Sequence, residues 1–184
     1  MFNQETDERL LERAVRGDES AFVEVYHRHR DAVFGFAYRL IGSIEIAEDI
    51  THDCFLSLMK NLERYDSKKA SLKTYLLAAV RNLALKHFNK TKASVSVEDL
   101  QYEIPVKNLS HERLIEQEVS ALVQKAIIEL PPYQREALIL FEYENLSLLE
   151  IAEIIGIDAN AVKQRLHRAR TNLRKTLSSF EYKL

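Results

Sequence analysis

The chain has 184 residues, of which 46% are hydrophobic and 29% charged, and its formal net charge at pH 7 is −2. This balance is ordinary for a soluble globular protein, and no apolar run reaches the roughly 18 residues that indicate a membrane span. No membrane insertion is therefore expected, and the charged N-terminus lacks the apolar centre of a secretory signal. The single cysteine, Cys54, excludes an internal disulfide and favours a reducing, cytoplasmic location, where it is interpreted as a small core residue.

Long helices are expected in the first part of the chain, because only four glycines and three prolines interrupt the sequence. Residues 18–40 carry apolar side chains at spacings of three and four, with Asp18 as the N-cap and Gly42 as the stop. A second helix is expected over residues 43–64. A third, over residues 71–90, is apolar around most of its circumference, which is typical of a helix central to its domain.

The composition changes after this third helix. The region that begins at residue 91 is rich in serine and β-branched residues, contains Pro105 and has no helical period. Residues 91–112 are therefore interpreted as a flexible linker between a domain at 1–90 and a second domain at 113–184.

The second domain contains the signals of a helix-turn-helix. Ser147 and Glu150 form a capping box that begins a short helix, and Gly156 suits the left-handed turn that ends it. Asp158 then caps a second helix, whose apolar stripe includes Val162. The expected fold class is all-α, with two small helical domains joined by a flexible linker, the C-terminal one a four-helix domain with a helix-turn-helix.

The second helix of this motif has an unusual charge pattern. The stretch NAVKQRLHRARTNLRK, residues 160–175, contains six lysines and arginines and no acid. Solvated surface helices normally mix charges of both signs, so contact with DNA is favoured over a merely solvated face. Because a major groove admits such a helix, duplex DNA is expected to contact Lys163, Gln164, Arg165, His167, Arg168 and Arg170.

A second acid-free basic window lies between Asp66 and Glu98, and aromatic residues such as Tyr75 and Phe88 are interleaved with its lysines. Positive charges together with aromatic rings suit single-stranded nucleic acid, because its bases stack on the rings, and this interpretation is favoured over the alternative that both rings belong to the core. Two basic windows in two domains would hold one DNA molecule at two places.

The helix expected at residues 43–64 also offers a face for a protein partner. Opposite its core stripe an apolar side chain lies among charged and polar ones, which suits a docking anchor, although one exposed leucine could be chance. The residues of this face are Asp49, His52, Asp53 and Leu56.

These features together resemble the sigma-70 family of bacterial RNA polymerase sigma factors, in its extracytoplasmic-function group. The stretches AEDITHDCFLSLMKNLERYD and SLKTYLLAAVRNLALKHFNK resemble two helices of the family's first domain. In the second domain, LPPYQREALILFEYENLSLLEIAEIIGIDANAVKQRLHRAR follows the pattern L-P-x-x-x-R, then E-I-A-x-x-L-G, then T-V-K-x-R-L-x-R-A-R. The resemblance covers residues 10–90 and 114–177.

The resemblance implies a transcription initiation factor that is not an enzyme and needs no cofactor or metal. It implies docking of the helix at 43–64 on the β′ clamp helices of core RNA polymerase, further contact with the β flap, and regulation by an anti-sigma factor in many members. The helix at 160–175 would contact the −35 promoter element. The unpaired −10 element would lie near Ser71, Lys73, Thr74, Arg81, Asn82 and Lys86.

Four positions depart from the family pattern. Tyr75 stands where tryptophan is usual, Lys86 where aspartate is common, and His52-Asp53 replaces a glutamine-glutamate pair. The effect of Tyr75 and Lys86 on −10 preference is therefore open.

Two other classes of function compete with this interpretation. A stand-alone helix-turn-helix regulator would bind a palindromic operator as a dimer without polymerase. An enzyme is disfavoured because the sequence offers no nucleophile–base pair, phosphate loop or convergent ligand set. His29 falls on the apolar stripe and is interpreted as a core histidine, whereas His27 and His52 are expected to be exposed.

Overall fold

The computed structural model describes residues 5–92 and 121–181. Every regular element within these two ranges is a helix, which confirms the all-α fold class. The linker expected at 91–112 lies outside the described residues except for 91 and 92, which continue the preceding helix beyond the boundary expected at 90.

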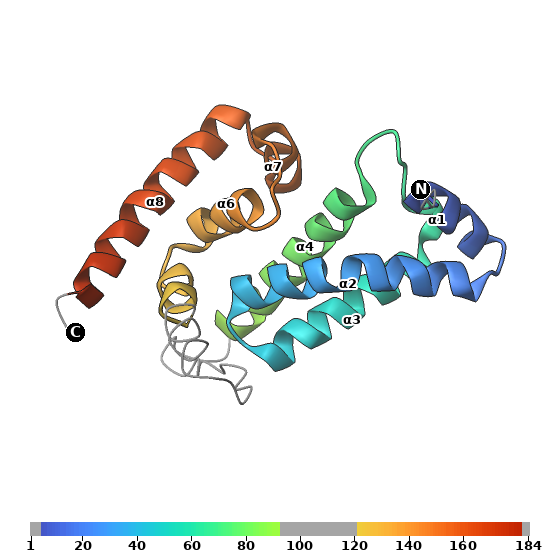
Figure 1. The fold of residues 1–184 in the computed structure, drawn as a ribbon, viewed down its shortest axis with the longest axis horizontal. Helices are drawn as coiled ribbons and strands as arrows, with labels where there is room; N and C mark the ends of the chain where they lie inside the picture. The colour runs from blue at the N-terminus through green and yellow to red at the C-terminus, as the bar shows by residue number, and fades with distance from the viewer. Residues whose placement is uncertain (1–4, 93–120, 182–184) are drawn as a thin grey trace.

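The N-terminal domain consists of four α-helices and one short 3-10 turn (Figure 1). Helix α2 begins and ends where local chemistry predicts. The Asp18 carboxylate accepts hydrogen bonds from the backbone N–H groups of Ser20 and Ala21, and Gly42 adopts a left-handed conformation with φ of 85°. The elements are α1 (Asp7–Val15), α2 (Glu19–Ile41), α3 (Ile44–Lys60), η1 (Leu62–Arg64) and α4 (Leu72–Lys92).

The helix expected over residues 43–64 is shorter in the structure. Ser43 caps its start as expected, but α3 ends at Lys60 and only the 3-10 turn η1 follows. The Asn61 side chain donates a hydrogen bond to the Ser57 carbonyl at 2.9 Å. Asparagine side chains that bond to nearby backbone in this way offer the chain an alternative to continued helix, which explains the break.

The C-terminal domain contains a helical segment over residues 121–128 followed by three further helices. Pro132 occupies the first turn of its helix, where a missing N–H costs nothing. Asn145, at φ of 56°, makes the tight connection to the next helix, and asparagine tolerates this left-handed conformation better than most residues. The helices are α6 (Pro132–Glu142), α7 (Leu148–Ile155) and α8 (Ala159–Glu181).

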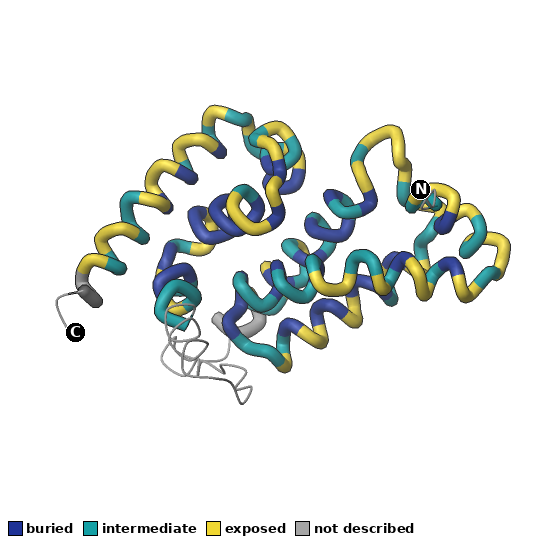
Figure 2. Tube along the Cα trace, in the orientation of Figure 1, coloured by how far each residue is buried: buried dark blue, intermediate teal, exposed yellow. Residues whose placement is uncertain are grey.

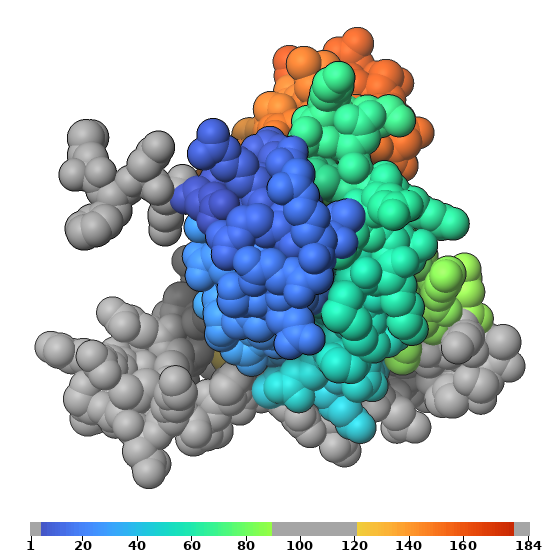
Figure 3. Space-filling model, turned by 90° about the vertical axis from the view of Figure 1, so that its right-hand side faces the viewer, coloured from blue at the N-terminus to red at the C-terminus, as the bar shows by residue number. Residues whose placement is uncertain are grey.

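The two domains pack against each other. Helix α2 contacts α6, and α4 contacts α7 (Figure 1). Buried apolar residues of both domains form one cluster, and the inward faces of α2, α4 and α6 are accordingly dark in the burial view (Figure 2). Figure 3 shows the N-terminal domain in front, with the C-terminal domain rising behind its upper edge. The structure is therefore a closed arrangement of the two domains.

Candidate nucleic-acid interface

The helix-turn-helix expected from the sequence is formed by α7 and α8. The Glu150 carboxylate accepts a hydrogen bond from the Ser147 backbone N–H at 2.8 Å, while the Ser147 hydroxyl accepts one from the Glu150 N–H at 3.3 Å. Gly156 ends α7 in a left-handed conformation, and the Asp158 carboxylate accepts a hydrogen bond from Ala161 at the start of α8. These caps fix the angle between the two helices.

Helix α8 has one buried side and one open side. Val162, Leu166 and Ala169 are buried against α6 and α7, as the apolar stripe predicted. On the other side, four of the six side chains of the predicted DNA-contact set are exposed and form no ion pair within the described residues. This open face consists of Lys163, Gln164, His167 and Arg168, followed by Arg174 and Lys175.

Arg165 and Arg170 lie at the edges of this open face and turn toward α6. Arg165 Nη1 lies 2.9 Å from Oε1 of Glu136, and Arg170 Nη2 lies 2.6 Å from Oε1 of Glu142. The Arg170 guanidinium also lies over the Phe141 ring, 5.2 Å from its centroid, a favourable cation–π geometry. Part of each guanidinium is therefore occupied by a carboxylate of α6 in this structure.

The loop before α4 is braced by a pair of tyrosines. The Tyr65 hydroxyl donates a hydrogen bond to the Ala70 carbonyl at 3.1 Å, so it ties the two ends of the loop together. Its ring meets the Tyr75 ring edge-on, with centroids 5.5 Å apart. Burial raises the pKa of Tyr65, and the nearby carboxylates of Glu8 and Asp7 raise it further. Both Tyr75 and Phe88 pack against the core cluster, as the alternative interpretation of these rings expected.

The six residues predicted to lie near the −10 element do not form one surface. Ser71, Asn82 and Lys86 are exposed on one side of α4. Thr74 is buried, and its hydroxyl lies 2.8 Å from that of Ser71 in a cap of the helix start. The remaining two residues, Lys73 and Arg81, point toward the C-terminal domain.

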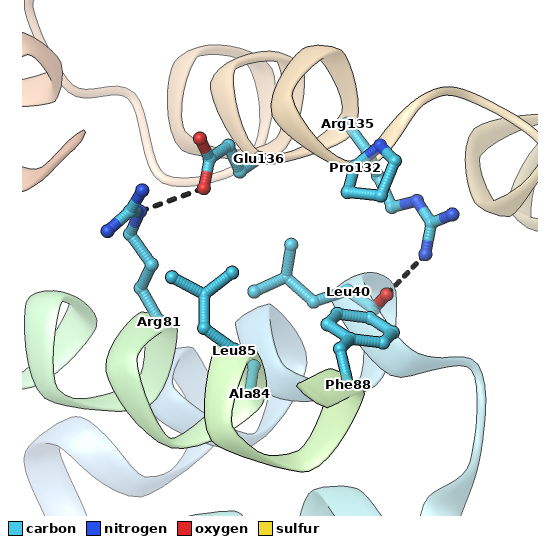
Figure 4. A pocket seen from close by; sticks show the side chains of 8 residues that line it. All are labelled: Leu40, Arg81, Ala84, Leu85, Phe88, Pro132, Arg135 and Glu136. Carbon is cyan, nitrogen blue, oxygen red and sulfur yellow. Dashed lines mark hydrogen bonds and ion pairs between the residues drawn. The ribbon is translucent and has the colours of Figure 1, made fainter. Parts of the chain in front are cut away.

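Lys73 and Arg81 are bound to buried carboxylates of the other domain. Lys73 Nζ lies 3.0 Å from Oε2 of Glu144 and also donates a hydrogen bond to the Glu144 carbonyl at 2.9 Å. Arg81 Nε lies 2.8 Å from Oε2 of Glu136, the same carboxylate that binds Arg165 through its other oxygen. Figure 4 shows the Arg81–Glu136 pair across a small cleft between α4 and α6, which has an apolar floor that includes Leu40, Leu85 and Phe88.

Arg135 crosses the same interface beside this cleft. Its guanidinium donates a hydrogen bond to the Leu40 carbonyl at 2.5 Å (Figure 4). It also donates to the carbonyls of Leu130, at 3.1 Å, and of Ile128. The Leu40 carbonyl belongs to the last turn of α2, where carbonyls lack helical partners and a cation is favourable. This arginine, the last residue of the L-P-x-x-x-R motif, therefore joins the two domains and fixes the start of α6.

The face of α3 predicted to dock on polymerase lies on the surface. Asp49, His52 and Asp53 are exposed, and Leu56 is half-buried. Met59, which is 49% exposed, lies one turn beyond Leu56 and extends this face. The sequence analysis missed Met59, although its spacing of three from Leu56 could have found it.

The histidines and the cysteine have structural surroundings that fit the expectations. His29 Nε2 lies 2.8 Å from Oδ2 of Asp7, while His27 and His52 are exposed. Cys54 is buried, and burial raises the pKa of its thiol to about 12. Within residues 5–92 and 121–181, no three His, Cys, Asp or Glu side chains gather in a way that could hold a metal ion.

The sequence analysis also missed Glu136 and Glu144 as partners of the basic windows. Glu136 lies 55 residues from Arg81, and Glu144 lies 71 residues from Lys73. No local pattern links residues so far apart, and nothing in the sequence distinguishes these two acids from the other glutamates of the chain.

Comparison with known proteins gives consistent matches to one family. The model of sigma-70 region 2 matches residues 25–94, and that of sigma-70 region 4 matches residues 120–173. The chain is 29% identical to the ECF RNA polymerase sigma factor SigW of Bacillus subtilis, over 91% of this chain and 94% of SigW. It is also 29% identical to the RNA polymerase sigma-H factor of Pseudomonas aeruginosa, over 96% of each chain.

Solved structures share the fold. The sigma factor RpoE of Bartonella quintana, crystallised with the anti-sigma factor NepR, superposes with a TM-score of 0.71 at 24% identity, covering 85% of this chain and 96% of that one. CnrH, in complex with the cytosolic domain of CnrY, gives a TM-score of 0.71 at 20% identity, covering 95% of this chain and 99% of that one.

Among the described helices, none combines the length and the apolar character needed to cross a membrane. The family matches fall on both domains, one on the helices that carry the α3 face and the basic α4, the other on the helix-turn-helix. The chain belongs to the sigma-70 family of RNA polymerase sigma factors, in its extracytoplasmic-function group.

Proposed function

We propose that this protein binds core RNA polymerase and directs it to promoters by contacting two DNA elements with its two domains. The C-terminal domain, residues 113–184, contacts the −35 element as duplex through the open face of α8. The N-terminal domain, residues 1–90, docks on polymerase through α3 and contacts the opened −10 element through the loop before α4 and the exposed side of α4.

The observation that carries this proposal is the open face of α8. Lys163, His167 and Arg168 project from a rigidly capped helix and have no acidic neighbour on that face. A recognition helix presents its N-terminal residues to base edges in the major groove, and Lys163 and Gln164 lie in the first turns of α8. Arg174 and Lys175, further along the helix, suit phosphates, which position the protein without reading sequence.

The face of α3 supports the proposed contact with polymerase. Asp49, Asp53 and Leu56 lie on one side of a helix whose opposite side is buried in the domain core. An apolar side chain ringed by charges on a rigid helix suits a docking anchor for the β′ clamp helices. The β flap is the corresponding partner for the C-terminal domain.

An anti-sigma factor is a further proposed partner. The solved relatives RpoE and CnrH were each crystallised with a protein bound, NepR and CnrY respectively. The proposed role places this chain in the cytoplasm with polymerase and requires no reaction, cofactor or metal from the chain itself.

Transcription with purified components tests the proposal. Sigma-free core polymerase is mixed with this chain and a library of promoter fragments, and the transcripts are sequenced. We expect transcripts that begin at a defined distance from shared −10 and −35 sequences. Tight binding to a palindromic sequence by a dimer, with no effect on polymerase, would instead establish a stand-alone regulator.

A matched pair of variants tests the polymerase contact. Leu56→Asp places a charge in the α3 face. Val23→Asp places the same charge at an apolar side chain of α2 that is 50% exposed. We expect Leu56→Asp to abolish co-elution with core polymerase and Val23→Asp to leave it intact, with equal helical content by circular dichroism. Unchanged co-elution of Leu56→Asp would refute the docking face.

A further inference from the structure

The closed arrangement uses three cations that the sequence analysis expected to contact DNA. Lys73 and Arg81 of α4 and Arg165 of α8 all lie within ion-pair distance of a carboxylate, and only two carboxylates serve the three cations. Both carboxylates, Glu136 and Glu144, are buried. They belong to the C-terminal domain, so the pairs of Lys73 and Arg81 exist only while the domains touch.

We propose that Glu136 and Glu144 form an electrostatic latch, which holds the free protein closed by occupying these cations in place of DNA phosphates. The consequence for transcription rests on the proposed function, whereas the latch itself is a property of the free chain. Opening separates Glu136 from Arg81 and Glu144 from Lys73, and it frees the basic side of α4.

The closed form cannot contact both promoter elements. Positions −35 and −10 are 25 base pairs apart, which corresponds to about 85 Å along B-DNA at 3.4 Å per base pair. In the structure, Arg81 and Arg165 bind the two oxygens of one carboxylate, at 2.8 and 2.9 Å. Side chains that share a carboxylate cannot reach sites so far apart, and the two domains must therefore separate before both elements are bound.

Polar contacts other than the latch pairs also cross the interface, beside the shared apolar cluster. The Arg39 guanidinium lies over the Tyr143 ring at 4.2 Å, and Arg135 bonds to the Leu40 carbonyl. A buried ion pair gains little net stability because both groups lose water, but removal of one partner leaves an uncompensated buried charge. Polymerase and DNA, which supply a docking surface and new anionic partners, can therefore shift the population toward the open form.

Energy transfer between two dyes measures domain separation in the free chain. Glu48→Cys on α3 and Ser178→Cys on α8 provide exposed labelling positions in the two domains, and the native Cys54 is buried. Two variants weaken the latch with little change in shape: Glu144→Gln, which removes the carboxylate that binds Lys73, and Glu136→Gln. The control is Glu142→Gln, which breaks an exposed ion pair on α6, with Arg170 of the same domain.

We expect high transfer efficiency in the unmodified chain and in Glu142→Gln. Glu144→Gln and Glu136→Gln should raise the ratio of open to closed molecules by about tenfold or more, because each leaves a cation without its carboxylate. Efficiency that is already low in the unmodified chain, or equal in all three variants, would overturn the latch.

Exchange of the two charges distinguishes opening of the latch from loss of the fold. Lys73→Glu should open the chain because it faces Glu144, and the double variant Lys73→Glu with Glu144→Lys should close it again at least in part. Failure of the second change to restore transfer, with normal helical content, would count against the latch.

Addition of core polymerase links the latch to function. Binding with a fall in transfer efficiency is expected, and binding without any fall would overturn the proposed opening. If polymerase does not bind at all, the proposed function is wrong, and the measurements on the free variants still decide whether the latch exists.

Discussion

The two basic windows look alike in the sequence and differ in the structure. Both are stretches of lysine and arginine without an acid, one in α8 and one around α4. In α8, Lys163, His167 and Arg168 remain open to solvent. In α4, Lys73 and Arg81 are neutralised by glutamates of the other domain.

The difference shows what a local charge pattern can and cannot predict. An acid-free stretch predicts that no partner lies on the same helix, since i and i+4 neighbours are the ones a helix supplies. It does not exclude partners from elsewhere in the fold. The open face of α8 is therefore available for the proposed DNA contact, whereas the inner side of α4 would first have to exchange a carboxylate for a phosphate.

The largest effect is expected from a charge reversal on the open face. Arg168→Glu should reduce transcription from −35-dependent promoters by more than about 100-fold, because a carboxylate facing DNA phosphates costs several kcal/mol. The free energy of unfolding should stay within about 0.5 kcal/mol of that of the unmodified chain, since Arg168 is exposed. Lys125→Glu, at an exposed position outside α8, is the control and should retain most activity. Equal losses in both variants would show a general charge effect instead of a recognition face.

Removal of an edge arginine should have a smaller effect. Arg165→Ala should weaken promoter binding by about 1–3 kcal/mol if the guanidinium contacts a base. To distinguish a base contact from a phosphate contact, binding is measured to promoters that are changed at single positions of the −35 element. A base contact relaxes preference at one position, whereas a loss equal across all sequences would show a phosphate contact.

Two lysines of α4, one paired with a buried carboxylate and one exposed, allow the same comparison within one helix. Lys73→Ala leaves the buried Glu144 carboxylate without its cation and should lower the free energy of unfolding of the free chain by about 1–3 kcal/mol. Lys86 is exposed, so Lys86→Ala should change the free energy of unfolding by less than about 0.5 kcal/mol. Urea unfolding of both variants measures the difference. Equal stabilities would show that Lys73 is not held in solution as in the structure.

The helices were predictable because their ends are decided by neighbouring residues. Asp18, Gly42 and Ser43 delimit α2 and start α3, and Gly156 ends α7, as capping chemistry predicts. The early end of α3 at Lys60 was missed, because it depends on how one asparagine side chain is used. The exposure of the other face of α8 followed from the apolar stripe on its buried side.

The domain closure could not be predicted from the sequence. It depends on pairs such as Arg81 with Glu136 and on Arg135 reaching the end of α2, contacts that join residues 55 and 95 positions apart. The motif that contains Arg135 identified the family, but its carbonyl partners in two domains are visible only in the fold. Long-range pairing of this kind carries no periodic signal along the chain.

The smallest predicted effect is a change in the pKa of the Glu150 carboxyl group, which tests whether the closed state exists in solution. The pKa of Glu150 lies below its ordinary value, chiefly because the Ser147 hydroxyl and then the Ser147 backbone N–H donate hydrogen bonds to its carboxylate. The Lys73 cation of the other domain lowers this pKa further. A depressed carboxyl pKa stabilises the folded state above the unfolded pKa, and this contribution is lost as pH falls through the folded value.

Lys73→Gln should therefore raise the pKa of Glu150 slightly while leaving the capping box intact. The remaining Ser147 hydrogen bonds should still hold it below the ordinary glutamate value. Carboxyl chemical shifts followed by NMR between pH 2 and about 7 measure both forms, with Lys86→Gln as the control that should leave the titration unchanged. The same pKa in Lys73→Gln and in the unmodified chain would indicate that Lys73 does not lie near α7 in solution. In that case α4 would be as open as α8, and the contrast between the two basic windows would disappear.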